Sequence, residues 1–404
     1  MSKFKAIEPS VYPWYKYSDY TFSLGLATET DAFISGHTAS TFNAETGRMI
    51  VVGGMTDQVN TAYDKIECIL EAAGMTFTDI TRVVENVTVS GLPHYAEAQA
   101  VRIARFNGHT PTITTVLVDA LLRPEAFIEI EVYTTKGGGK KLNSGDDLNW
   151  ARNTVTEGHD GSVFLPTLLP IDKDGNVVHE GDFVAQYRYC LERGGELLSQ
   201  VGLSLDNAVT TYDYSMPETR TIYGKTSRVR KELLGGAGVF PGAGGILMSQ
   251  LHKPGVLVAI DLVASRYPLK GVNPGWKRYD TLSYTPGVIA GKTLYMSGFA
   301  SLDMETQEAT HAGDIVAQAQ STYEAILLVL KEAGVGPEAL VNTIEYVVPE
   351  GLKEYRGVAK VRENLLTKPG RHRLVRSVIH YCDQNSCLKY FRWRYCHDLV
   401  DRCN

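Results

Sequence analysis

The residues best suited to hold a metal ion gather near the end of the sequence. Four of the six cysteines fall within the last 23 residues, and three histidines accompany them: Cys382, Cys387, Cys396, Cys403, His372, His380 and His397. Thiolates and imidazoles are the usual zinc ligands, but these spacings contain no CxxC pair, so we expect no metal site. A disulfide framework is not expected in an intracellular chain of this size either.

A pair of carboxylates is a better candidate for chemistry. Glu129 and Glu131 alternate with Ile128 and Ile130 in a run that reads as a β-strand. Because successive side chains of a strand point to opposite faces, both acids share the face away from the isoleucines. A carboxylate in that position can transfer protons as a general acid or base, and an ordinary polar sheet face explains the pattern equally well.

Charge and hydropathy exclude several classes of partner. The 404 residues include 40 Lys and Arg and 46 Asp and Glu, a net charge of −6, which gives no general attraction for nucleic acid or an acidic membrane. Apolar stretches such as 255–264 stop near ten residues, whereas a membrane-spanning helix needs about 20. The first residues, MSKFKAIEPSVYPW, lack the apolar core of a secretory signal. We therefore expect a cytoplasmic protein without a nucleic-acid or membrane partner.

An internal repeat organises the chain. Residues 53–74, 181–202 and 313–334 align without gaps, and two residue types recur at spacings of 128 and 132 residues: Gln58, Gln186 and Gln318, then Gly74, Gly202 and Gly334. In the first copy the apolar residues Met55, Val59, Ala62, Ile66, Ile69 and Leu70 follow the period of an α-helix. Each segment is therefore predicted to be a helix that ends at its closing glycine.

The flanking segments repeat as well. A strand-like run follows each helix (81–89, 208–215 and 340–348), and then a more charged helical stretch (94–107, 219–235 and 352–366). Further strands precede each unit's first helix and follow its second. The pattern predicts an α+β unit, a sheet with both helices on one face. We divide the chain into an aromatic leader, three repeats and short polar linkers, with the second repeat degenerate: 1–19, 20–137, 150–267 and 279–404.

The repeats resemble a known family. The third copy, from SYTPGVIAGKTLYMSGFASLD through the helix ending LKEAG, is similar to the RidA/YjgF enamine/imine deaminases. The first copy matches in LGLATETDAFISGHTA, in LEAAG and in RPEAFIEIEVYTT. Members of this family are typically homotrimers with clefts between subunits. The resemblance implies three RidA-like (chorismate-mutase-like) units fused into an intramolecular pseudo-trimer with three unequal clefts.

The resemblance also implies which residues act. The family uses an arginine that binds a substrate carboxylate, a glutamate that handles the protons of an attacking water, a tyrosine on the cleft wall, and the serine of a Ser-Gly pair. No repeat matches all four. The matching residues are Glu129 and Ser35 in the first repeat, and Tyr284, Ser297 and Arg371 in the third. Arg123, in a turn of the first repeat that we expect to be exposed, is a second candidate for anion binding.

The remaining family positions are lost. The arginine position holds Ile113 and Ala243 in the first two repeats, the tyrosine position holds Phe22 in the first, and the glutamate position holds Ala259 in the second. The second repeat therefore reads as scaffold. The serines could equally bond to backbone at a strand end, and Tyr284 could simply pack against the wall.

The tail, residues 371–404, departs from the repeat. It bears no similarity to the final strands of the first two repeats and contains neither glycine nor proline. Either the reading frame is altered near codon 370 or the divergence is genuine. In the first case the third sheet would lack its last two strands, and the Arg371 match would be accidental.

The sequence thus predicts a hydrolytic deaminase that acts on a small enamine or imine without cofactor or metal. If an arginine binds the substrate, as in the family, this substrate carries a carboxylate. Glu129 and Tyr284 are the predicted catalytic residues, and Arg371, Ser35, Ser297 and Arg123 the predicted substrate-binding residues. Two alternatives remain: a cofactor-free cyclase or isomerase acting on a pathway intermediate, and a non-catalytic small-molecule-binding protein of the same fold.

The fused architecture makes a prediction about assembly. Three repeats that bury their sheets against one another within one chain have no need of further copies. We expect a monomer of 44.5 kDa, or a low-order oligomer such as a dimer, in sedimentation equilibrium. A homotrimer of about three times that mass, with three-fold contacts between chains, would contradict the fused-trimer reading.

Overall fold

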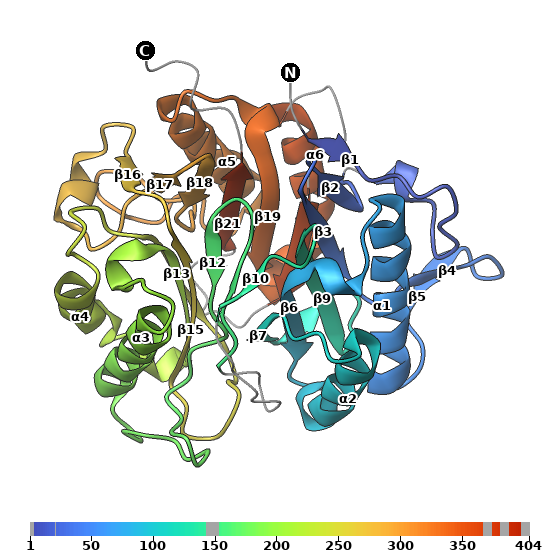
Figure 1. Cartoon of the computed structure of the whole chain (residues 1–404). Helices are drawn as coiled ribbons and strands as arrows, with labels where there is room; N and C mark the ends of the chain where they lie inside the picture. The colour runs from blue at the N-terminus through green and yellow to red at the C-terminus, as the bar shows by residue number, and fades with distance from the viewer. Residues whose placement is uncertain (1–3, 21, 143–152, 367–373, 380–387, 397–404) are drawn as a thin grey trace.

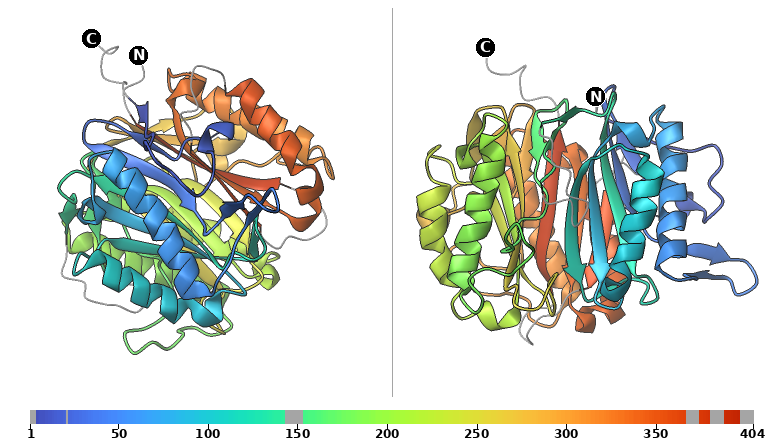
Figure 2. Two further views of the ribbon diagram at one scale, coloured as in Figure 1. Left: turned by 90° about the vertical axis from the view of Figure 1, so that its right-hand side faces the viewer. Right: turned by 60° about the horizontal axis from the view of Figure 1, so that its bottom comes forward.

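Three β-sheets, one per repeat, lie next to one another with helices on their outer faces (Figure 1). The computed structural model describes residues 4–20, 22–142, 153–366, 374–379 and 388–396, the last two segments as backbone only. Two views from other directions show the helices of each repeat on the outside and the strands toward the middle (Figure 2). This is the α+β arrangement that the sequence predicts.

The three sheets share one strand order. The first contains β1-β2-β3-β9-β6-β7, the second β10-β11-β12-β15-β13-β14, and the third β16-β17-β18-β21-β19-β20, with β8 added at its edge. In the first repeat the strands are β1 Lys5–Ala6, β2 Gly25–Ala27, β3 Asp31–His37, β6 Ile80–Thr88, β7 Thr112–Val118, β8 Ala120–Leu121 and β9 Ile128–Thr135, with a separate hairpin of β4 Thr41–Asn43 and β5 Arg48–Ile50. In the second they are β10 Lys140–Lys141, β11 Thr156–Glu157, β12 Ser162–Phe164, β13 Ala208–Ser215, β14 Gly242–Leu247 and β15 Val258–Ser265. In the third they are β16 Leu269–Val272, β17 Gly287–Ala290, β18 Thr293–Met296, β19 Leu340–Val347, β20 Leu374–Ile379 and β21 Leu388–Cys396.

The long helices form where the apolar period predicts them. They are α1 Met55–Ala72, α3 Phe183–Ser199 and α5 Ile315–Glu332. The closing glycines have φ angles of 67°, 74° and 78°, the left-handed conformation that ends a helix and that glycine adopts without steric cost. The second helices are α2 Tyr95–Phe106, α4 Thr226–Leu233 and α6 Tyr355–Leu365. α4 is shorter than predicted because two 3₁₀ turns, 217–219 and 223–225, replace its first part.

Each sheet begins earlier in the chain than the predicted repeat boundaries. β1 lies in the leader, and β10 and β16 lie in the two segments assigned as linkers. β8, from the first repeat, pairs with β20 of the third. The segments between repeats therefore contribute edge strands rather than serving only as connections.

The tail supplies the two strands that complete the third sheet. The backbone of β20 runs parallel to β19, and β21 lies between β18 and β19, as the equivalent strands do in the other sheets. Of the two alternatives for the tail, the one in which the third sheet lacks its last two strands is therefore not met by the backbone. Arg371 and the histidines and cysteines at 372, 380, 382, 387, 397 and 403 lie outside the described residues.

Residues from all three sheets meet in one apolar core that includes Val116, Tyr214 and Tyr346. The hydroxyls of Tyr214 and Tyr346 lie 2.9 Å apart, across the second and third repeats. Several buried polar contacts also cross between repeats. An Arg82 nitrogen lies 2.6 Å from the Asp261 carboxylate, and the Asn342 amide donates to Glu131 over 2.8 Å.

A buried acid ties the second helix of a repeat to the strand that follows the first helix. In the first repeat Arg102 of α2 donates to both oxygens of Glu85 on β6, over 2.5 and 2.6 Å, and Tyr95 donates to the same carboxylate. In the third, Arg362 of α6 donates to both oxygens of Glu345, over 2.6 Å each. Both acids are fully buried. Such a charge is tolerated only because the arginine and the hydroxyl compensate it.

This interaction predicts a large stability effect at Arg102. Arg102→Met would leave Glu85 buried without its cation, which costs about 3–5 kcal/mol of unfolding free energy. Urea denaturation would measure the loss. Arg105→Met is the matched control on the same helix, since Arg105 pairs with the half-exposed Asp64 and Glu67 and should change stability by less than about 1 kcal/mol. Equal losses in the two variants would contradict this account.

Candidate functional site

The predicted site residues fall into two separate places. Glu129 and Ser35 lie together in the first repeat, whereas Tyr284 and Ser297 lie where the third repeat meets the second. Arg123 is exposed in the turn between β8 and β9, as expected, and Arg371 lies outside the described residues. The two predicted catalytic residues therefore lie apart, Glu129 in the first repeat and Tyr284 at the seam of the second and third repeats.

Glu129 sits opposite an irregularity in the neighbouring strand. The pairing of β3 with β9 shifts register between Ile34 and His37, a β-bulge that contains the Ser-Gly pair. A Cβ atom at Gly36 would collide with the Glu129 carboxylate, so a larger residue there would displace this carboxylate from its place against the bulge. Glu129 is half-buried and Ser35 is buried. We call Ser35, Gly36, His37, Lys65 and Glu129 the Glu129 site.

The aromatic leader covers this site. The Tyr12 hydroxyl lies 3.5 Å from His37 Nδ1, and His37 Nε2 lies 3.4 Å from Ser35 Oγ. Tyr12 also donates to the Tyr15 hydroxyl over 3.3 Å. Burial raises the pKa of Tyr15 to about 12, and the Glu129 carboxylate adds to the increase. The leader is thus packed against the first repeat, on the side where Glu129 lies.

His37 and Lys65 are buried ionisable groups in the same site. Burial and, to a smaller extent, the nearby Lys65 charge lower the pKa of His37 to about 3, so His37 is neutral at pH 7. Lys65 Nζ donates to the carbonyl oxygens of Thr38 and Ser40, over 2.7 and 2.5 Å. Burial lowers its pKa to about 7. These bonds fix the loop that follows β3, directly after the bulge.

The hydroxyls of both predicted serines bond to backbone. Ser35 donates to the Leu24 carbonyl over 3.0 Å. Ser297 donates to the Thr285 carbonyl over 2.7 Å and accepts from the Ala243 amide over 2.9 Å. The Ala243 contact crosses from the second to the third repeat. The serines therefore hold strand ends and a seam in place.

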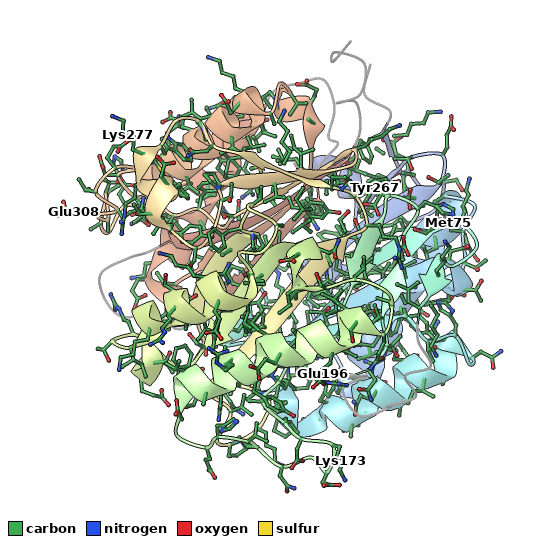
Figure 3. All side chains as sticks on the ribbon, turned by 60° about the vertical axis from the view of Figure 1, so that its left-hand side comes forward. Met75, Lys173, Glu196, Tyr267, Lys277 and Glu308 are labelled. Atoms are coloured by element: carbon green, nitrogen blue, oxygen red, sulfur yellow. The ribbon has the colours of Figure 1, made fainter. Side chains whose placement is uncertain are left out.

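Tyr284 lines a cavity of about 240 Å³ between the second and third repeats. Its ring lies edge-on to Tyr279, with centroids 5.5 Å apart, and burial raises the pKa of its hydroxyl. The other walls come from α4, from β14 and from the segment after β18. Figure 3 shows Lys277 and Glu308 at one edge of the molecule, on the two segments that contribute Tyr279 and Gln307 to the cavity.

The register of the sheets changes the assignment of the family's arginine position. Ile113 pairs with Val83 and Ala243 with Thr211, and the equivalent residue of β19, Thr343, pairs with Val375. The backbone of Val375, four residues beyond Arg371, therefore occupies this position in the third sheet. The alignment from the turn proline missed this shift because Pro369 lies six residues before this position, whereas Pro111 and Pro241 lie two residues before it.

Sequence reasoning missed Arg230, which is buried at the wall of the cavity. A signal was available, because three residue types recur at the same spacings of 128 and 132 residues as the glutamines: the acids Glu85, Asp213 and Glu345, the tyrosines Tyr95, Tyr223 and Tyr355, and the arginines Arg102, Arg230 and Arg362. His37, Lys65 and the leader tyrosines had no such signal, since they have no counterpart in the other repeats.

Comparison with known proteins supports the family. A family model described as Endoribonuclease L-PSP matches residues 16–136 and 279–380, more than half of the chain. Similar solved structures include E. coli TdcF with bound serine, at 24% identity and a TM-score of 0.27, which covers 32% of this chain and 98% of its own. Another is Rv2704 of Mycobacterium tuberculosis, a member of the YjgF/YER057c/UK114 family, at 24% identity and a TM-score of 0.25, over 30% and 90% of the two chains.

A longer match is to a chorismatase. It covers 79% of this chain and 93% of the chorismatase, at 15% identity and a TM-score of 0.52, a likeness of fold.

Among the described residues, no helix has the length and apolar character needed to cross a membrane. Within that same part of the chain, no group of three or more His, Cys, Asp or Glu side chains is arranged to hold a metal ion.

Proposed function

Because the chain belongs to the Endoribonuclease L-PSP family, the RidA/YjgF family, we propose that it hydrolyses a small enamine or imine at the Glu129 site. The observation that carries the proposal is the placement of Glu129. A half-buried carboxylate lies against Gly36 at a bulge, with a neutral imidazole and tyrosine hydroxyls nearby. A carboxylate in such surroundings is suited to moving protons.

In the proposed reaction a water molecule attacks the carbon of a protonated imine. Glu129 takes a proton from that water as the carbon–oxygen bond forms. It then gives this proton to the nitrogen. As the carbon–nitrogen bond breaks, Glu129 accepts the proton of the new hydroxyl and passes it to the departing ammonia, so the products are a carbonyl compound and ammonium, and no electron is gained or lost. Tyr284 has no part in these steps, because it lies at the seam of the second and third repeats, away from the Glu129 site.

A second candidate is a cyclisation or isomerisation of an intermediate that lacks a carboxylate at the family's usual position. It is favoured by the residues at that position, since Ile113 and Ala243 cannot bind an anion through their side chains and Val375 aligns with them by register. Glu129 would still serve as the acid–base group in such a reaction.

Replacement of Glu129 tests the proposal. Glu129→Gln keeps the size of the side chain but cannot shuttle a proton, so turnover should fall about 10²–10⁴-fold with little change in melting temperature. The measurement is release of ammonia from a small imine generated in the assay. Glu131→Gln is the control on the same strand face: it alters the buried contact with Asn342, so it should lower the melting temperature and leave turnover nearly unchanged.

Wild-type turnover by the Glu129→Gln protein would refute the role of Glu129. Absence of imine hydrolysis by the wild-type protein, with Glu129 still needed for another cofactor-free conversion, would favour the second candidate.

A further inference from the structure

Asn86 lies directly opposite Glu129 in the first sheet. The two residues are partners in the antiparallel pairing of β6 with β9, so their side chains share one face of the sheet. The next pair on that face is Val84 and Glu131, and Glu131 contacts Asn342 of the third repeat. Asn86 therefore faces the other repeats, on the same side of the sheet as the Glu129 carboxylate.

The Asn86 amide is buried without a hydrogen-bond partner. Its side chain is fully buried, and within the described part of the chain neither Oδ1 nor Nδ2 bonds to another group. An amide that leaves water without making such bonds destabilises the fold, and an apolar side chain of the same size would avoid this cost. The packing of the sheet therefore does not explain an asparagine at this position.

The other two repeats have tyrosines at the position of Asn86. Tyr214 and Tyr346 follow it at the repeat spacings of 128 and 132 residues, and their hydroxyls contact each other in the shared core. In neither repeat is the strand partner a glutamate, and the partner of Tyr214 is Ala259. Among the three repeats, the short amide thus occurs only opposite the retained carboxylate.

The Glu129 carboxylate leans away from Asn86. It lies against Gly36 of β3, which is the neighbour of β9 on the side away from β6. The Cβ atoms of directly opposite residues in an antiparallel pair are about 4.5–5.5 Å apart. Two polar groups that are this close without bonding to each other can bind one water molecule between them.

We propose that Asn86 is a water-positioning residue of the Glu129 site, an inference that rests on the proposed hydrolysis. Its Oδ1 accepts one hydrogen of the attacking water, while the Glu129 carboxylate accepts the other. With both hydrogens bound, the lone pairs of the water oxygen are directed at the imine carbon. Glu129 takes its proton as the carbon–oxygen bond forms, and Asn86 exchanges no proton.

Asn86→Leu tests the role of the amide. Leucine has nearly the same size but cannot hold the water, so kcat for imine hydrolysis should fall about 10²-fold while KM changes by less than about twofold. The melting temperature should stay the same or rise, because the variant removes a buried amide that has no partner. A purely structural role for Asn86 would instead lower the melting temperature.

Thr88→Val is the matched control, two residues further along the same strand. The buried Thr88 hydroxyl donates to the Phe127 carbonyl over 3.2 Å and accepts from the Gly91 amide over 3.0 Å. Loss of these bonds should lower the melting temperature and leave kcat nearly unchanged, the reverse of the effect expected for Asn86→Leu.

Wild-type kcat in Asn86→Leu, together with loss of turnover in Glu129→Gln, would overturn the inference and leave the proposed hydrolysis standing. A lower melting temperature of Asn86→Leu would overturn it as well, because the amide would then hold the fold. A raised KM with unchanged kcat would do the same, by showing that Asn86 binds the substrate rather than the water. If the wild-type protein hydrolyses no imine, or Glu129→Gln keeps full turnover, the inference and the proposed hydrolysis fail together.

Discussion

In the first and third repeats, a glutamate on the strand after the long helix is buried completely and bonded by an arginine from the second helix. An unpaired carboxylate could not remain charged at that depth, so the helix must dock where its arginine meets the acid. Once the helix is docked on the outer face, the opposite face of the sheet is left to pack against the other repeats. The common core at Tyr214 and Tyr346 is the result.

The second repeat departs from this rule, and the departure has a defined consequence. Its acid is Asp213, which burial makes harder to ionise, with Arg230 and two tyrosine hydroxyls only partly opposing the rise in its pKa. Arg230 then extends to the third repeat, where it donates to the Ser283 carbonyl. The second repeat lacks the family's site residues and reads as scaffold. It nevertheless places the Arg230 cation at its seam with the third repeat.

Fusion into one chain allows the seams to differ. In a homotrimer every substitution appears at all three interfaces, whereas here each seam has its own residues. The seam of the second and third repeats has a cavity with an arginine. The Glu129 site, in the first repeat, has a carboxylate, a neutral histidine and the leader tyrosines. Each seam can therefore change independently of the others.

Much of the fold was predictable from the sequence, because the helix period and the closing glycines recur at fixed spacings. Glu129 and Ser35 could also be brought together, since the family resemblance aligns both with one repeat. The role of Arg230 could not be predicted in this way. It depends on the length of one side chain, Asp213, and on where a freed guanidinium finds new acceptors, which is a property of packing between repeats. The position of Arg371 was predicted from a turn proline, and the strand register places Val375 there instead.

The central claim is that the second repeat has released its arginine to the seam. A crystal structure of the protein tests it most directly. The account predicts that Asp213 accepts from the hydroxyls of Tyr187 and Tyr223, and that Arg230 donates to the Ser283 carbonyl of the third repeat. An Arg230 paired with Asp213 as Arg102 is with Glu85 would contradict the account.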